Sequence, residues 1–326
     1  MSTLQVEHLS AAELRAEAHG TIEQLTATMF GAVELSPHNL RTLIGGVAIG
    51  SVLMEGQPGT GKTLMAKTLA LAIGGVYQRI QGSPDVQPSD IVGYEFWHQG
   101  KQELEFRPGA ALRANVLFAD ELNRNPEKSQ AAFLEVMEEG QVTIDGFTYF
   151  AQKPLTVIAT QNPIEEPGTN PLPRAELDRF AVSLQTDQTP EVEAEILSRY
   201  TRTSNEAPIK PVGLAKVSSL REAVKTVALP TKEKELILAL KDKIGRYEEV
   251  NPMFSILNGR AKLRMADVAR FHTLARGENE ANVNVEDVVF AAYAVLGHRI
   301  QLTHTAAREG NTPRDIIEHA IKSVAA

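Results

Sequence analysis

The stretch GQPGTGKT, residues 56 to 63, has the glycines, lysine and threonine of a phosphate-binding loop in the expected order. Apolar residues 51–55 precede it and residues 64–73 follow it, which predicts a strand before the loop and a helix after it. Glycines let backbone N–H groups close around phosphate oxygens, and a helix start favours negative charge. We expect Lys62 to reach the β- and γ-phosphates of ATP and Thr63 to offer its hydroxyl to Mg²⁺. The expected nucleotide contacts are Gly56, Gln57, Pro58, Gly59, Thr60, Gly61, Lys62, Thr63 and Leu64.

Two adjacent carboxylates end another apolar run, in NVLFADELNR. Hydrolysis of a phosphate bond needs a carboxylate for the metal and a base for the attacking water. We expect Asp120 to hold Mg²⁺, directly or through water, and Glu121 to point at the γ-phosphate as the base. Adjacent carboxylates at a strand end can also simply cap the next helix. The phosphate loop upstream favours the catalytic interpretation.

A third strand pattern, residues 155–160, ends in polar residues and leads into a proline-rich loop. Ligands bind beyond the carboxyl ends of the strands in such sheets, so Asn162 is expected to face the same cleft and orient water. Arg179 follows the loop, and a guanidinium there can stabilise charge on a transferring phosphoryl group, in its own subunit or in a neighbour. The alternatives are a turn amide for Asn162 and a surface ion pair of Arg179 with Asp178 or Glu176.

Strand and helix patterns alternate up to about residue 186, which predicts a mostly parallel α/β sheet with helices on both faces. The expected strands are 51–55, 76–81, 116–119, 155–160 and 181–185, with helices at 64–73 and 128–139. Two hairpins interrupt this order, at 94–106 and at 141–150, the second around the type I′ turn signal Asp145-Gly146. A helix from Pro190 to about residue 200 and a linker precede a region in which only helices are expected, at 232–247, 259–277, 285–300 and 313–324.

The chain has 326 residues, more than one core usually needs, and three parts are expected. They are an N-terminal helical segment at 1–30, a nucleotide-binding α/β domain at 31–203 and a helical lid at 204–326. The net charge of -8 makes nucleic acid an unlikely partner. The absence of cysteine excludes disulfides and thiolate metal sites, and no apolar run is long enough for membrane insertion. We therefore expect a cytoplasmic protein.

These motifs together resemble the MoxR family of AAA+ ATPases. The resemblance lies in the loop at 56–63, DEL at 120–122, ATQNP at 159–163 and PLPRAELDRF at 171–180. It continues through 79–95, 106–124 and 134–146, and covers roughly residues 50–186.

The resemblance implies roles for three residues. Asn162 resembles the sensor-1 residue, Arg179 the arginine finger, and Arg260 the sensor-2 arginine that contacts phosphate. The hairpin at 94–106 resembles the helix-2 insertion of the wider clade that includes magnesium chelatase. Its aromatic residues are expected either to contact a pore or a partner, or to pack locally.

The chain departs from the family pattern in places. The lid segment has Asn258-Gly259 where relatives commonly have Ser-Pro, and Arg174 stands where many have Glu. Arg174 and Arg124 are therefore additional candidates for a subunit interface, the alternative for Arg124 being a solvated arginine at a helix end.

The resemblance further implies a homo-oligomer, a hexameric ring whose ATP turnover remodels or matures client proteins or inserts a metal or cofactor. It also implies a partner with a von Willebrand factor A domain. Two other functions stay open on the sequence. A DNA-acting motor would use the same catalytic residues, and a nucleotide-gated scaffold would bind ATP but hydrolyse little of it.

Overall fold

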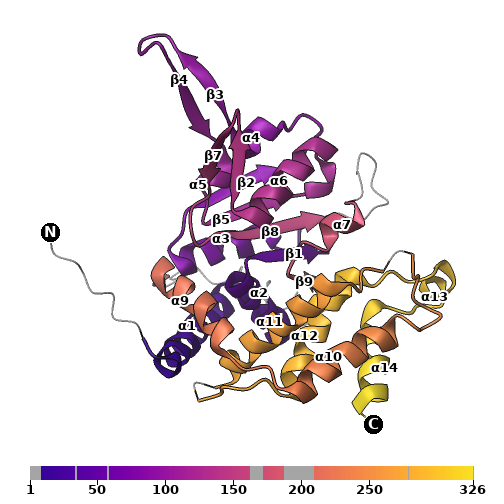
Figure 1. The fold of residues 1–326 in the computed structure, drawn as a ribbon. Coiled ribbons are helices and arrows are strands. Elements are labelled where there is room, and N and C mark those ends of the chain that lie inside the picture. Colours follow the sequence, from indigo (N-terminus) through magenta and orange to yellow (C-terminus); the bar gives the residue numbers. More distant parts are fainter. Residues whose placement is uncertain are drawn as a thin grey trace, which may run out of the picture.

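The computed structural model describes residues 9–33, 35–56, 59–161, 172–186, 209–253, 255–277 and 279–325. A parallel five-stranded sheet forms its centre, in the order β2-β5-β8-β1-β9 (Figure 1). The strands are β1 (Ser51–Glu55), β2 (Tyr77–Gln81), β5 (Val116–Asp120), β8 (Thr156–Gln161) and β9 (Val182–Gln185). The predicted α/β fold is confirmed, and all five strands end at the same edge of the sheet.

Helices cover both faces of this sheet, because its strands are apolar on both sides. Along β1, Val52 and Met54 belong to one core and Leu53 to the other. The first core is shared with α2 (Pro37–Ile49) and α3 (Lys62–Ile73). The second is shared with α4 (Pro88–Val92), α5 (Ala110–Arg113) and α6 (Glu127–Glu139).

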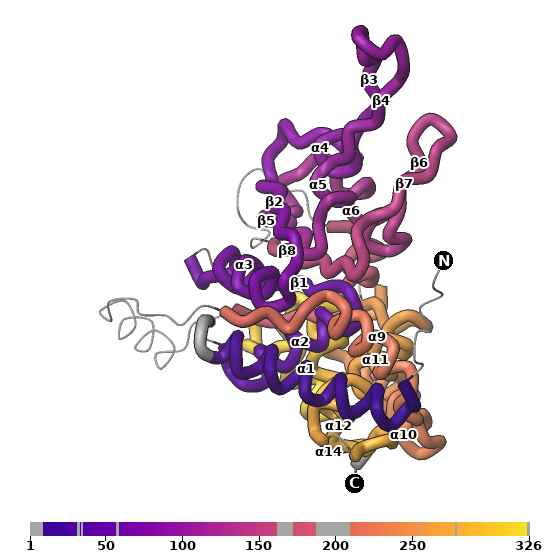
Figure 2. Tube along the Cα trace, turned by 90° about the vertical axis from the view of Figure 1, so that its left-hand side faces the viewer, coloured from indigo at the N-terminus to yellow at the C-terminus, as the bar shows by residue number. Residues whose placement is uncertain are grey.

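Two hairpins project from the end of the molecule opposite the lid (Figures 1 and 2). They are β3 (Gly93–His98) with β4 (Glu103–Pro108), and β6 (Gln141–Ile144) with β7 (Phe147–Phe150). Asp145 and Gly146 both have positive φ, 48° and 87°, as the predicted type I′ turn requires. Phe106 stacks on Tyr149 at 3.6 Å between ring centroids, which joins the hairpins, while Trp97 near the first tip is 58% exposed.

The C-terminal part is helical, as expected, from α9 (Leu214–Thr226) to α14 (Pro313–Ala325). Between them lie α10 (Thr231–Ile244), α11 (Gly259–Arg276), α12 (Val285–Leu296), the 3₁₀ turn η2 (Gly297–Arg299) and α13 (His304–Arg308). The sequence did not single out α9, and the helix expected at 190–200 falls outside the described residues.

The first helix, α1 (Ala11–Ala32), starts at a capping box formed by Ser10 and Glu13. It lies along α9 (Figure 2), and its Leu25 and Met29 are fully buried in the core that also contains lid residues. The boundaries predicted at 30/31 and 203/204 stay predictions. Within the described part of the chain, no helix is long and apolar enough to cross a membrane.

Candidate functional site

A cavity of about 400 Å³ opens at the edge of the sheet where the strands end. The loop after β1 and the carboxylates after β5 face each other across it, as the sequence predicts. Gln57 and Pro58 lie outside the described residues. The residues that line the cavity are Gly59, Thr60, Gly61, Lys62, Thr63, Leu64, Asp120 and Glu121.

The loop delivers the start of α3 to this cavity. Gly61 is the N-cap with φ 76°, a left-handed conformation that glycine adopts without strain, and no side chain caps this helix end. The first backbone N–H groups of α3 therefore face the cavity, where a helix start attracts an anion. Lys62 is 8% exposed, and its Nζ donates to the Gly56 carbonyl at 2.7 Å, so the ammonium lies over the loop.

Thr160, which the sequence analysis gave no role, holds both carboxylate residues in place. Its buried hydroxyl donates to Asp120 Oδ1 at 2.9 Å and accepts from the Glu121 backbone N–H at 2.8 Å. Glu121 has φ 55° and ψ 49°, which is uncommon for a residue other than glycine. This hydrogen bond helps to stabilise that backbone and turns the Glu121 side chain toward the cavity.

Cationic and amide side chains surround the two carboxylates. Arg79 donates to Asp120 Oδ2 at 2.6 Å, and Arg124 Nη1 donates to Glu121 Oε2 at 2.8 Å. Gln81 Nε2 lies 3.4 Å from the same Glu121 oxygen. Arg79 and Gln81 lie on β2, which is the neighbour of β5 in the sheet. The strand order would have been needed to predict that their side chains lie beside the two carboxylates. Arg124, expected either at a subunit interface or solvated at a helix end, forms an ion pair with Glu121 of its own chain in this structure.

The arrangement fits a nucleotide phosphate with Mg²⁺. Positive charge and backbone donors lie on one side of the cavity, at Lys62 and the start of α3. On the other side Thr63 Oγ1 lies 3.4 Å from Asp120 Oδ2, which puts a hydroxyl and a carboxylate together. Mg²⁺ prefers hard oxygen ligands of this kind. Arg79 balances the Asp120 charge in this structure, so a bound cation would share or take over that role.

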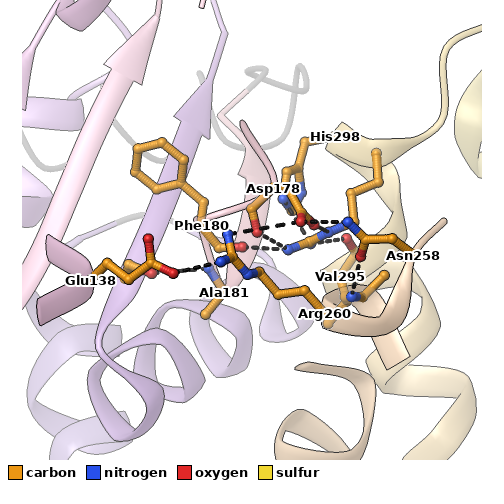
Figure 3. A network of polar contacts seen from close by, with 11 residues as sticks. Glu138, Asp178, Phe180, Ala181, Asn258, Arg260, Val295 and His298 are labelled. Carbon is orange, nitrogen blue, oxygen red and sulfur yellow. Dashed lines mark hydrogen bonds and ion pairs between the residues drawn. The ribbon is translucent and has the colours of Figure 1, made fainter. Parts of the chain in front are cut away.

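The two arginines expected at phosphate lie elsewhere. Arg179 and Arg260 meet on one carboxylate, Glu138 at the end of α6. Arg179 Nε lies 3.2 Å from Oε2. Arg260 Nη2 lies 2.5 Å from Oε1 (Figure 3). Neither lines the cavity at the phosphate loop. They line a second, more open cavity of about 1020 Å³, together with Arg174 and Arg246.

The alternative expectation for Arg179 is a surface ion pair with Asp178 or Glu176. In the structure Arg179 forms its ion pair with Glu138. Glu176 lies in the turn α7 (Arg174–Leu177), where burial raises the pKa of its carboxyl against the opposing effect of Arg179. Asn162, the expected water-orienting amide, lies outside the described residues. The last described residue of β8, Gln161, donates instead to Glu55 Oε1 at the end of β1.

Two family models match this chain. Residues 51–182 match the ATPase family associated with various cellular activities (AAA), and residues 257–320 match the AAA lid domain. The first range contains the phosphate loop, both carboxylates and Arg179. The second contains Arg260.

Curated relatives and a solved structure agree with these models. The chain is 36% identical to chaperone MoxR1 of Mycobacterium tuberculosis over 298 residues, 87% of this chain and 76% of the relative. It is 34% identical to the uncharacterized protein YeaC of Bacillus subtilis over 306 residues, 93% of this chain and 92% of that protein. A solved structure from Cytophaga hutchinsonii, described as a candidate ATPase, superimposes with a TM-score of 0.81 at 32% identity, covering 95% of this chain and 96% of its own.

Proposed function

This chain belongs to the MoxR family of AAA+ ATPases and hydrolyses ATP, and from that premise we propose that it works as a ring subunit whose active site is completed by Arg179 of a neighbour. One observation carries the proposal. Arg179 and Arg260 share Glu138 and line the 1020 Å³ cavity, while the phosphate loop lines the other cavity. Arginines that act on phosphate but lie apart from their own phosphate loop are suited to a phosphate presented by another subunit.

Within one subunit, the proposed roles follow from the geometry. Lys62 and the start of α3 hold the phosphates, and Thr63 with Asp120 would hold Mg²⁺, which neutralises charge on the phosphoryl oxygens. Glu121 takes the proton of the attacking water. Arg124 donates to only one oxygen of this carboxylate, Oε2, so that hydrogen bond does not prevent the proton transfer. Asn162 is the proposed residue that orients this water.

Between subunits, Arg179 stabilises the charge that grows on the transferred phosphoryl group, and Arg260 contacts the same phosphate. Both guanidiniums then exchange the Glu138 carboxylate for phosphoryl oxygens. ATP binding and hydrolysis at one site are thereby linked to the α6 end and the lid of the next subunit. We further propose a hexamer that remodels or matures client proteins, with a partner carrying a von Willebrand factor A domain, as the family resemblance implies.

Mixing two inactive variants tests the shared site. Arg179→Ala should lower turnover by roughly a thousandfold with ATP affinity retained, because a finger acts mainly in the transition state. Glu121→Gln should bind ATP and hardly turn it over, because an amide accepts no proton. In mixed rings, an Arg179→Ala subunit with intact Glu121 can meet the intact Arg179 of a Glu121→Gln subunit, so activity should return. Mixed rings no more active than the sum of the separate variants would refute the shared site.

A further inference from the structure

Arg299 is a buried cation in the 3₁₀ turn η2 that follows α12, with a side chain that is 0% exposed. A buried guanidinium is tolerated only where its donors are satisfied. Its Nε donates to Asp178 Oδ1 at 3.1 Å, and its Nη1 donates to the Val295 carbonyl at 2.6 Å and to His298 Nε2 at 2.8 Å. Its Nη2 donates to the carbonyls of Asp178 at 2.8 Å and Phe180 at 2.7 Å. Burial lowers the pKa of Arg299 to about 10, and the Asp178 carboxylate opposes that shift.

The two carbonyls bound by Nη2 are those of the residues on either side of Arg179. One planar group of the lid therefore fixes the backbone from which the Arg179 side chain projects. The guanidinium of Arg179 is held separately, by Glu138 on α6. The base of this side chain is thus set by the lid, and its tip by the sheet domain.

The Asp178 carboxylate extends the contact to the start of α11 (Figure 3). Its Oδ2 accepts from Asn258 Nδ2 at 2.7 Å, and Asn258 caps α11 by accepting from the Ala261 N–H at 3.1 Å. Arg260 Nη1 lies 3.9 Å from the same oxygen. A substitution at Asp178 would disturb Arg299 and Arg260 at once, because its carboxylate contacts both. A change at Arg299 removes the support of the Arg179 backbone and leaves the Asn258 contact in place.

We propose that Arg299 is a positioning residue for Arg179, holding the backbone on both sides of it so that the guanidinium reaches the phosphoryl group at the neighbouring site. The proposal rests on the proposed function for its direction, from one subunit to the next. The lid then contributes to catalysis even if none of its residues contacts the ATP bound in its own subunit.

The first test is a double-mutant cycle. Arg299→Gln should lower turnover by roughly 10- to 100-fold, because a displacement of about 1 Å costs on that order, with ATP affinity unchanged. Since Arg299 acts through Arg179, the double variant Arg179→Ala with Arg299→Gln should be no slower than Arg179→Ala alone. The proposal would be overturned if the turnover losses of the two single variants multiplied in the double variant. This holds whether Arg179 acts in its own subunit or on a neighbour.

The second test uses mixed rings. Arg299→Gln subunits keep an intact site of their own, so mixing them with Glu121→Gln subunits should restore turnover, as mixing restores Arg179→Ala. Restoration of Arg179→Ala but not of Arg299→Gln would overturn the positioning role. Failure of both mixtures, with non-multiplying losses in the cycle, would instead refute the shared site and retain the positioning role within one subunit.

Arg221, a half-buried arginine of the C-terminal helical part, provides the control for Arg299. It lies on α9 and donates to the Val47 carbonyl at 3.0 Å and the Leu155 carbonyl at 2.7 Å, so it also binds backbone of the sheet domain, away from Arg179. Arg221→Gln should lower the melting temperature but keep the turnover of the folded ring. The same turnover loss in both variants would mean that Arg299 only stabilises the fold.

A second substitution covers the case in which Arg299→Gln does not fold. Arg299→Lys keeps a positive charge beside Asp178, so that carboxylate is not left unpaired, but an ammonium lacks the planar fork that spans both carbonyls. It should show a smaller turnover loss that Glu121→Gln subunits again restore. Wild-type turnover by Arg299→Lys would show that charge alone suffices and that the two-carbonyl contact has no part in catalysis.

Discussion

The phosphate-loop cavity and the arginine cluster at Glu138 are built in opposite ways. Most of the cavity comes from one short segment, residues 59–64, completed by two consecutive carboxylates after β5. The cluster comes from three separate elements, α6, the segment after α7 and α11, whose side chains meet at one carboxylate. The cavity presents the start of α3 and Lys62, whereas the cluster presents two guanidiniums.

The difference suggests a division of labour. A site made by one loop can bind nucleotide whenever that loop is folded, so binding should be a property of the single subunit. A cluster made by the sheet domain and the lid together depends on the relative position of those two parts. It is therefore suited to respond to contact between subunits or to control it. Variants at the two sites should therefore separate nucleotide binding from contact between subunits.

The largest effect on ATP binding is expected at Lys62. Lys62→Ala should weaken ATP binding by on the order of 10- to 100-fold, because a charge-assisted contact to phosphate is lost. Titration of unassembled subunits with a fluorescent ATP analogue measures this. Lys67→Ala, on the exposed side of the same helix, is the control, and Arg260→Ala should also leave this affinity unchanged. Weaker binding by Arg260→Ala in single subunits would place that arginine at its own nucleotide and break the comparison.

Thr160→Val should lower turnover roughly tenfold or more, because Glu121 and Asp120 each lose a hydrogen bond worth about 1 kcal/mol and the Glu121 backbone loses its restraint. ATP affinity should change less than turnover. Steady-state hydrolysis and equilibrium binding, measured on the same preparation, give both numbers. Thr156→Val removes a buried hydroxyl from the other end of β8, and it should cost stability without a comparable loss of turnover. Equal turnover losses in the two variants would leave Thr160 with no special role.

Glu138→Gln is expected to raise turnover severalfold in assembled rings. The carboxylate competes with phosphate for the two guanidiniums, and the amide competes less because it carries no charge. Stability should hardly change, because these side chains are about a third exposed and such ion pairs contribute little, about 0–1 kcal/mol. Glu139→Gln removes the same charge one residue away and is the control. Slower turnover in Glu138→Gln alone would mean that Glu138 aligns the arginines for reaction rather than competing for them.

The last prediction concerns the pH dependence of stability and leaves the two sites themselves unchanged. Burial holds the pKa of His298 well below its ordinary value of 6.5, and its Nε2 accepts from Arg299, so the folded protein keeps this ring neutral. The unfolded chain takes up a proton near pH 6.5, so acidification below that value favours unfolding, by at most about 1.4 kcal/mol per pH unit for one group. His38, whose pKa burial lowers to about 4, adds a change of the same sign.

Urea unfolding at about pH 7.5 and about pH 5.5 should show this loss of stability, and His298→Gln should reduce it, because an amide oxygen can accept the same hydrogen bond without titrating. An equal loss in the wild type and in His298→Gln would assign the acid sensitivity to other groups. In either case ATP affinity at the distant phosphate loop should follow the folded fraction only.

Short sequence patterns were enough to predict much of the fold. Apolar runs gave the five strands within a residue or so, and Asp145-Gly146 gave a turn with positive φ at both positions, because local backbone preferences decide such features. Helix α9 was not singled out from the sequence, although its buried residues Val217, Leu220 and Val224 recur at helical spacing. Its packing against α1 supplies the stability that the pattern alone does not predict.

The sequence by itself determined the phosphate-binding loop, because the residues proposed to contact phosphate follow one another along residues 59–64 and a glycine-rich loop before a helix can fold in few other ways. Only the tertiary structure decided what surrounds it. Thr160 acts because β8 lies beside β5, and Arg79 reaches Asp120 because β2 is the neighbour on the other side. Arg179, Arg260 and Arg299 are far apart in the chain, and their grouping depends on where the lid packs. A linear pattern carries no distance between such residues, so Glu138 and Arg299 became visible only in the folded protein.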